Sequence, residues 1–530
     1  SIANPCMQKL DKIELYSLPE YNADPASAIP LKVVHFEYDY MLCSHYPQNI
    51  DLGSDDFGTG KLTLKKVYFT YGNSNKGMYS PYAFGYGTNP AFNMTAMDRW
   101  GNYKASSSYY GSVASDPLRN SDFPYVGFDQ TAADYSASAW LMDTIHLPSG
   151  GRIEVAYESD DYAFVQHKKA QNMFKIIGVE SVEEQTIETD ETRSYLLGKG
   201  SHPDTTNMKV YFELIPHPDG GYYDDIDEYV TAGDTVYFRA LMEFGACNYD
   251  FVPGYAQVAP ANLEIVSHPT LPGVKIGCLP LVGAKLNDAG AAKYNPIAVA
   301  GIQFGRLRLS NFIPPSNQSP LNDDAGFTEL ANALGGAFTA FGEFFIGPNK
   351  PLWNKKIGTK IVLNHSWVRL NNPNQKKLGG GSRVKQIKMF DAWEEMTNQP
   401  LVGYHYGQEY SYTTADGKSS GVAAYEPQLG GDENPWRQPI ANDKEILLAP
   451  DIRNYQETPF GEQFFPSPRV GYSRVVVRDL KRQSVNRTAT GSVVHEFYTA
   501  KDFPTIVKRT QTDLKHRRNP QFALFFQSVI

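Results

Sequence analysis

One segment of the chain has the spacing of a serine nucleophile. Gly417-Lys418-Ser419-Ser420-Gly421 fits the G-x-S-x-G pattern, in which hydrolases place a serine on a sharp turn between a strand and a helix. Asp416-Gly417 is instead a signal for a hairpin turn, and the residues from Val422 to Tyr425 show no helical pattern. The segment therefore favours a turn over a nucleophile.

Clustered carboxylates are the second candidate. Asp224, Asp225 and Asp227 lie close together in one loop. Calcium takes about six to eight oxygen ligands, and a flexible acidic loop can supply several of them. A solvated acidic loop explains the same residues, so calcium is only a weak candidate cofactor. Asp160-Asp161 offers the same two interpretations, with less support for a metal.

The other residue types that carry chemistry form no local pattern. The eleven His are scattered, and the sequence has no H-E-x-x-H, Walker A or G-x-G-x-x-G motif. Two carboxylates far apart in sequence could still form a glycosidase pair, because such pairs leave no local signature. Tyr109-Tyr110, Tyr222-Tyr223 and Trp436 could stack on sugars if exposed, or pack in the core and in turns.

The four cysteines contain no C-x-x-C pair, which argues against a zinc site. Cys6–Cys43 and Cys247–Cys278 could be disulfides, because each pair lies within one local region. Free buried thiols are the alternative.

Charge and hydropathy exclude two broad classes. The net charge of −9 argues against binding nucleic acid along its phosphates, which needs a basic surface. No run of about 20 apolar residues is present that could span a bilayer. With 530 residues, the chain is long enough for two or three ordered units. It begins with Ser1 and ends on the apolar run Phe522 to Ile530, so we expect it to be a segment of a longer protein.

Most of the chain is predicted to form β-strands. Aromatic residues make up 13% of it, and Gly (44) and Pro (35) interrupt it often, as short strands and turns require. Leu31 to Tyr40 and Lys61 to Tyr71 alternate apolar and polar residues, which is the period of a strand. Further strands are predicted at Arg152 to Tyr157, Met208 to Leu214, Thr235 to Leu241, Thr359 to Leu363, Val384 to Phe390, Tyr406 to Tyr412, Arg474 to Arg478 and Val493 to Tyr498.

One amphipathic helix is expected, at about 324–346. Asp324 can cap it, and apolar residues from Phe327 to Phe345 recur at spacings of three and four. Gly347-Pro348 would end it. The preceding stretch, Cys247 to Pro315, is expected to hold short strands separated by Pro and Gly.

These patterns predict a mainly β fold in three regions. Residues 1–190 and 351–530 form an antiparallel sheet. Residues 191–350 differ in texture and are expected to be an inserted, sandwich-like β domain that ends in the helix.

Three different short motifs lie in the first and third regions. Asp98 to Tyr103 reads D-R-W-G-N-Y, Leu147 to Gly151 reads L-P-S-G-G before a strand, and Leu378 to Ile387 contains G-G-S-R-V-K-Q-I. In this order they resemble segments of Rhs/YD-repeat proteins, which are very large secreted or cell-surface chains found notably in Bacteroidetes. The positions that carry the resemblance are Asp98, Trp100, Gly101, Tyr103, Pro148, Gly150, Gly151, Gly380, Gly381, Arg383, Gly421, Gly471 and Tyr472.

The resemblance implies an antiparallel sheet that winds into a hollow shell. In related proteins this shell encloses a toxic C-terminal payload. The repeated G-x-x-x-x-Y-x-Y-D-x-x-G-R units and the C-terminal self-cleavage region of some members are absent, so this segment would lie upstream of both. Its implied partners are the rest of its own polypeptide and an encapsulated C-terminal domain.

We therefore expect a secreted or cell-surface structural segment, not an enzyme, that forms a β-shell or scaffold and encloses or presents a toxin or effector. The first alternative is a cell-surface adhesin or carbohydrate-binding module, with residues 191–350 contacting glycans. The second is a glycoside hydrolase-like enzyme, which needs a deep pocket with two carboxylates about 5–10 Å apart.

Overall fold

The computed structural model is mainly β, as predicted. It describes residues 9–46, 60–104 except 95 and 99, 130–181, 186–190, 195–196, 208–244 except 218, 249–285, 292–308, 357–391, 405–427, 437–444, 452–459, 469–480 and 491–506. No helix in these ranges is long and apolar enough to cross a membrane.

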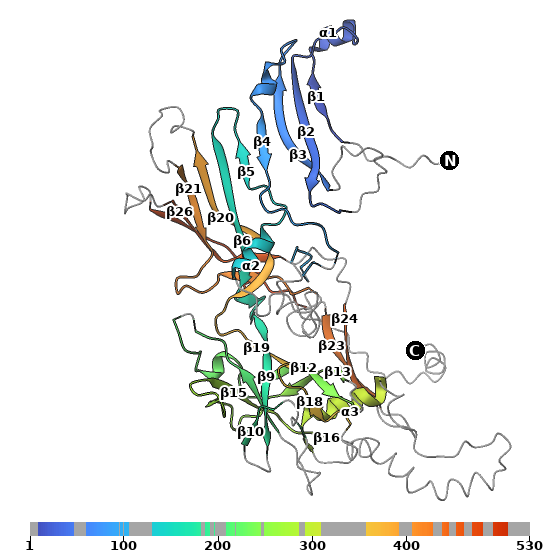
Figure 1. Ribbon diagram of the computed structural model, residues 1–530, viewed down its shortest axis with the longest axis vertical. Helices are drawn as coiled ribbons and strands as arrows, with labels where there is room; N and C mark the ends of the chain where they lie inside the picture. Colours follow the sequence, from blue (N-terminus) through green and yellow to red (C-terminus); the bar gives the residue numbers. More distant parts are fainter. Residues whose placement is uncertain are drawn as a thin grey trace, which may run out of the picture.

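A ten-stranded antiparallel sheet fills the upper half of the molecule in Figure 1. In spatial order its strands are β1 (Lys12–Leu15), β2 (Lys32–Leu42), β3 (Lys61–Thr70), β4 (Tyr82–Gly85), β5 (Thr144–His146), β6 (Arg152–Tyr162), β20 (Lys377–Phe390), β21 (His405–Ser411), β26 (Arg474–Asp479) and β27 (Ser492–Glu496). Neighbours in sequence pair up to β6, and then β20 pairs with β6. The chain between these two strands therefore leaves the sheet and returns to it.

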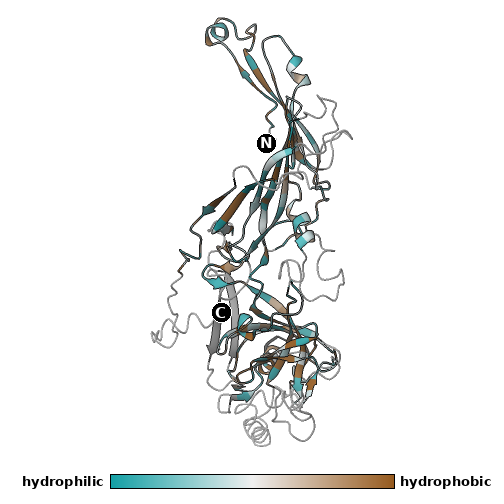
Figure 2. Ribbon diagram, turned by 90° about the vertical axis from the view of Figure 1, so that its left-hand side faces the viewer, coloured by the Kyte–Doolittle hydropathy of each residue, from teal (hydrophilic) through white to brown (hydrophobic). Residues whose placement is uncertain are grey.

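The two faces of this sheet differ in polarity. Residues paired across neighbouring strands lie on the same face, and successive residues alternate between faces. The strands accordingly show alternating hydrophobic and hydrophilic residues in Figure 2. One face, called here the apolar face, carries Ile13, Leu15, Val34, Phe36, Val67, Phe69, Tyr82, Phe84, Ile145, Ile153, Val155, Tyr157, Val384, Ile387, Met389, Tyr406, Tyr410, Val475, Val477 and Val493.

The opposite face, called the polar face, is mostly charged or hydrogen-bonding. Its members include Lys12, Glu14, His35, Glu37, Lys66, Thr144, Arg152, Glu154, Glu158, Arg383, Gln386, Lys388, Glu409, Arg478, Ser492 and Glu496. Ion pairs cross this face, such as Lys66 with Glu37 at 3.2 Å between Nζ and Oε2.

A second sheet lies in the lower half of the molecule in Figure 1. Its order is β13 (Tyr249–Gln257), β12 (Thr235–Glu243), β19 (Trp367–Asn371), β9 (Gln171–Ser181), β11 (Lys209–Glu213), β15 (Lys275–Pro280) and β14 (Glu264–Ser267), with β10 (Thr186–Glu188) on β9 and β18 (Lys360–Ile361) on β12. One half of β9 pairs with β19 and the other half with β11. The strands thus span a wider range than the 191–350 predicted for an inserted domain.

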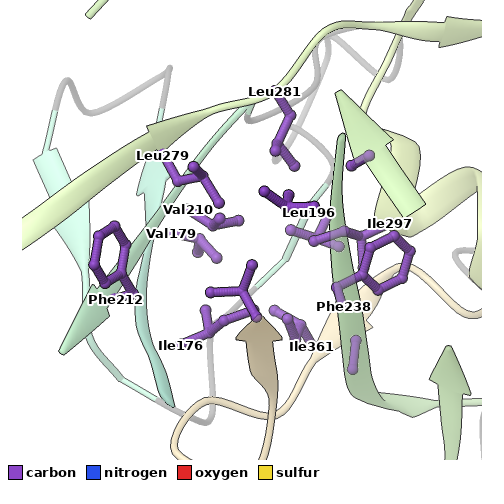
Figure 3. Close-up of a cluster of buried hydrophobic side chains, with 14 of the residues drawn as sticks. Ile176, Val179, Leu196, Val210, Phe212, Phe238, Leu279, Leu281, Ile297 and Ile361 are labelled. Carbon is purple, nitrogen blue, oxygen red and sulfur yellow. The ribbon is translucent and has the colours of Figure 1, made fainter. Parts of the chain in front are cut away.

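Side chains from the strands of this second sheet form most of the main hydrophobic core. Figure 3 shows side chains from β9, β11, β12 and β15 converging, among them Ile176, Phe212 and Phe238. These three side chains are at most 1% exposed. Full burial of such a side chain contributes about 1.5–3 kcal/mol, so the core makes this half of the molecule the better packed one.

The helices correct one prediction. The stretch assigned to short strands holds α3 (Pro296–Arg308), which packs against β12 and β13. Two shorter helices, α1 (Leu18–Ala23) and α2 (Gln130–Ala137), were also not predicted. The expected helix at 324–346 lies outside the described residues.

Smaller elements complete the fold. Four short strands, β7 (Phe164–Val165), β8 (Lys168–Lys169), β22 (Gly421–Ala423) and β25 (Val470–Tyr472), form a sheet beside the end of β6. The other elements are β16 (Ala284–Lys285), β17 (Ala292–Tyr294), β23 (Arg437–Lys444), β24 (Ile452–Pro459) and the 3₁₀ turns η1 (Lys76–Tyr79) and η3 (Ile226–Glu228).

Cys43 and Cys278 are buried free thiols, the alternative considered above. Cys6 and Cys247, which were suggested as their disulfide partners, lie outside the described residues.

Candidate functional site

Arg383 is the centre of a buried ionic cluster, called here the junction, where β6 and β20 leave the large sheet. Its Nε donates to Glu158 Oε1 at 2.8 Å, and its Nη2 donates to Asp161 Oδ2 at 2.8 Å. Its Nη1 donates to the Tyr472 hydroxyl at 2.9 Å. One guanidinium therefore joins β6 and β20 to the small sheet that contains β25.

Two aromatic rings lie beside the guanidinium. Its carbon lies 4.5 Å from the ring centroid of Tyr412 and 5.1 Å from that of Tyr472. The two rings are 4.6 Å apart. Tyr472 in turn donates to Asp160 Oδ1 at 2.5 Å. A guanidinium with two aromatic rings beside it and two carboxylates hydrogen-bonded to it is desolvated but paired.

Three glycines make room for this cluster. Leu378 pairs with Asp161 and Ser382 with Ser159, so Gly379 to Gly381 bulge out of β20. Their φ values of +136°, +119° and +138° are in a region that side chains rarely adopt. A Cβ on Gly380 would also collide with Val470. The G-G-x-R motif thus encodes a bulge that brings Asp160 to Tyr472.

Gly421 allows the small sheet to approach β6. A Cβ at this position would collide with the carbonyl of Asp161 and lie 3.0 Å from the Tyr162 Cα. Gly471, which pairs with Val422 beside it, has open space around its Cα. Only the first of these two glycines is therefore required by packing.

A second buried ion pair continues the junction toward the second sheet. Lys377 Nζ lies 2.6 Å from Glu426 Oε1, which also accepts from the Tyr162 hydroxyl at 2.5 Å. Lys377 further donates to the carbonyl of Gln171 at 2.6 Å. Since Gln171 begins β9, this pair links both sheets.

Burial sets the protonation of the junction. It raises the pKa of Asp160 to about 6, against the opposing effects of Tyr472 and Arg383. It also raises the pKa of Tyr412 to about 12, and that of Tyr472 well above its ordinary value. Burial disfavours the charge on Arg383, but Tyr472, Asp161 and Glu158 together raise its pKa above its usual value.

The D-x-W-G-x-Y motif forms a turn beside the junction. Asp98 Oδ1 accepts from the backbone N–H of Asn102 at 2.9 Å, and Gly101 has a φ of +79°. Trp100 packs edge-on against Tyr162 with 5.8 Å between ring centroids. Tyr103 points elsewhere and packs against Trp140, 5.0 Å away. This motif therefore approaches the junction through Trp100, which packs on Tyr162, and through the Asn102 side chain, which lies near Gly381.

The P-S-G-G motif lies apart from the junction. It forms the hairpin between β5 and β6, closed by the N–H of Leu147 donating to the carbonyl of Gly151 at 2.8 Å. Gly150 has a φ of +88°, and a Cβ on Gly151 would lie 2.8 Å from the carbonyl oxygen of Phe390. Pro148 begins this turn, a position that suits its fixed φ.

The serine motif is a turn, as predicted. The N–H of Gly417 donates to the carbonyl of Thr414 at 3.2 Å, and strand β22, not a helix, follows at Gly421. Ser419 Oγ donates to the carboxylate of Asp161. The serine is 5% exposed, so it belongs to the junction.

The acidic loop caps a turn. Asp225 Oδ1 accepts from the N–H of Asp227 at 3.1 Å, at the start of η3. Asp224 lies 3.7 Å from Lys275. In the described ranges, no group of three or more His, Cys, Asp or Glu side chains could hold a metal ion. The calcium hypothesis thus gains no support from this loop.

The candidate aromatic platform is mostly occupied by packing. Tyr222 and Tyr223 lie against the main core, and the Tyr223 hydroxyl donates to Asn374 Oδ1 at 3.2 Å. Tyr109-Tyr110 and Trp436 lie outside the described residues.

Two hollows open on the polar face of the large sheet. The larger, of about 270 Å³, is lined by Glu158, Lys385, Gln386, Glu409, Tyr410, Ser411, Val476 and Arg478. The other, of about 220 Å³, lies beside β5 and is lined by Asp143, Thr144, Glu154, Val155, Ala156, Gln386 and Lys388. In the larger one, the Glu158 carboxylate is bound by Arg383.

Sequence reasoning found Arg383, Tyr472 and the glycines only through their motif. It considered Asp160-Asp161 as a weak metal site and missed Tyr412 and Glu426. Every acidic group of the junction has a cation or hydroxyl partner. Such a satisfied network stabilises the fold and leaves no acidic group free to react. Comparison of the chain with protein-family models, curated proteins and solved structures finds no match.

Proposed function

We propose that this chain is an architectural segment of a large secreted or cell-surface protein of the Rhs/YD-repeat kind. Its ten-stranded sheet would serve as a wall whose apolar face lies against another polypeptide, such as an enclosed toxin or effector domain. The resemblance of the motifs supports this, and so does the role of the motif residues in fixing the sheet rather than in reacting.

The observation that carries the proposal is that the described residues leave the apolar face partly exposed. Among the described elements, only α2, η1, β22 and β25 make substantial contact with the strands of the large sheet besides the strands themselves. The side chains of Phe36, Phe84, Ile145 and Ile153 remain partly exposed. An apolar face of this width is stabilised when another layer covers it.

A photo-cross-linking experiment tests the proposal on the longer secreted protein. Benzoylphenylalanine replaces Phe69 on the apolar face or, as the matched control, the neighbouring aromatic Tyr68 on the polar face. We expect Phe69 to cross-link to a polypeptide segment that mass spectrometry can identify, and Tyr68 not to do so. No cross-link from either position, or equal cross-linking from both, would overturn the proposal.

A further inference from the structure

The large sheet ends in two open edge strands. In the described chain, β1 pairs only with β2 and β27 only with β26. All four residues of β1 and all five of β27 are exposed, with Leu15 at 58% and Val493 at 56%. An open edge offers unpaired N–H and C=O groups to an added strand.

The open edge of β27 has few of the usual protective devices, with Glu496 as its one acidic residue. Its sequence from Ser492 to Glu496 contains no Pro or Lys, and its register with β26 runs without a bulge. Exposed apolar residues follow it directly, with Phe497 at 54% and Tyr498 at 83%. Lysines, prolines and bulges are frequent protections of an edge strand, and without them this edge is suited to pairing.

We propose that β27 of one molecule pairs with β1 of a second copy of this chain and extends the sheet head to tail. The number of strands permits this geometry. All neighbours in the ten-stranded sheet are antiparallel, so β1 and β27 run in opposite directions. A second copy in the same orientation therefore brings its β1 antiparallel to β27, with its apolar face on the same side.

Charge and hydropathy select one register. When Glu496 is opposite Lys12, both lie on the polar face, and Val493 meets Leu15 on the apolar face. Lys12 Nζ is 2.6 Å from Glu14 in the isolated chain, and it would then lie between two carboxylates. A shift of two residues that puts Glu496 opposite Glu14 brings like charges together, which is unfavourable.

Such head-to-tail pairing uses different surfaces on the two copies, so the assembly stays open. The inherent twist of a β-sheet would wind it into a helical ribbon. The inference rests on the proposed function in treating the sheet as a wall, and it adds a second copy of the chain as the partner that continues that wall.

Engineered cysteines test the pairing directly. A Val493→Cys chain is mixed with a Leu15→Cys chain under mild oxidation, beside the parent chain, which contributes only its native cysteines. Val494→Cys is the matched control, because its side chain lies on the opposite face. We expect a disulfide-linked dimer from the Val493→Cys mixture and at least roughly tenfold less from the Val494→Cys mixture.

Charge exchange checks the register in the intact chain. Lys12→Glu and Glu496→Lys should each weaken self-association at least roughly tenfold in sedimentation experiments, and the double variant should restore it. Lys66→Glu, on the polar face of an inner strand, should leave it unchanged.

Three outcomes would overturn the inference: a chain that remains monomeric at every concentration, a Val493→Cys chain that cross-links only with itself, and equal yields from both cysteine mixtures. The wall proposal is judged separately, because cross-linking from Phe69 probes the apolar face and not the edges.

Discussion

At the residue scale, the central element is the pairing of Arg383 with two carboxylates at the end of β6. Removing one partner from a buried ionic cluster leaves the others uncompensated, which costs about 3–5 kcal/mol. We therefore expect Arg383→Met to lower the free energy of unfolding by about that amount in urea denaturation. Lys385→Met, two positions along the same strand with a side chain 56% exposed, should cost less than about 1 kcal/mol. Equal losses would contradict the role given to Arg383.

Gly421 and Gly471 provide a second test, on two paired strands of the small sheet. Gly421→Ala forces a Cβ against the backbone of β6, and overpacking of this kind costs about 1–3 kcal/mol. Gly471→Ala meets open space and should be neutral or slightly stabilising, because alanine restricts the unfolded chain. Thermal unfolding of both variants measures the difference. A Gly421→Ala protein as stable as the Gly471→Ala protein would contradict the close packing described here.

Asp160 makes stability depend on pH. Its pKa is raised from 3.8 to about 6, so the folded protein binds this proton more tightly than the unfolded chain. The resulting stabilisation is complete below pH 3.8 and is lost as the pH rises through 6. Between these two pH values, we expect the free energy of unfolding of the parent protein to fall by about 3 kcal/mol. Asp160→Asn cannot titrate at this position, so its free energy of unfolding should not show this fall. Urea unfolding of both proteins across this range measures the loss, and parallel pH profiles would contradict it.

Sequence patterns could identify the motif residues but not their partners. Glu158 and Arg383 are 225 residues apart, and nothing local in the sequence shows that β20 returns to β6. Asp160-Asp161 therefore read as a metal candidate, although Asp161 is in fact bound to Arg383. The only local sign of a long-range salt bridge is a charged residue in an apolar strand, and this sign does not identify the partner.

At the element scale, the sequence patterns predicted most strands of the large sheet, because one face is apolar and the other polar along most of them. The short strands β1, β4 and β5 were not predicted. The helix α3 was missed because Gly301 and Gly305 resemble breakers. In the fold both glycines are packing positions: a Cβ on Gly301 would collide with the carbonyl of Gly358, and one on Gly305 would press on Phe244. Here tertiary packing overrides the low helical propensity of glycine.

The same scale gives a test of the apolar face. Ile153→Glu places a charge on a face that other described elements leave partly exposed, so it should cost less than about 1 kcal/mol and reduce the binding of a hydrophobic dye. Ile176→Glu buries a charge in the main core, where Ile176 is 0% exposed, and should prevent the second sheet from folding. Circular dichroism and dye fluorescence separate the two cases. Unfolding by Ile153→Glu would show that this face is already covered.

At the scale of the whole molecule, the two sheets are linked at the junction. Among the described residues, the main hydrophobic core belongs to the second sheet, while the large sheet is held by pairing between its strands and by the junction at its base. The sequence predicted a separate region at 191–350 from its different composition, and that division stays a prediction. It could not show that β9 and β19 belong to the lower sheet, because pairing between strands far apart in sequence is set by tertiary contacts.

The most direct measurement is an electron cryo-microscopy map of the protein. We expect the ten strands to form part of a continuous curved wall, with another polypeptide segment against the side that carries Phe36, Phe84 and Ile153. A map in which that side faces bulk solvent, or in which the sheet stands alone beside separate compact domains, would contradict the proposed role.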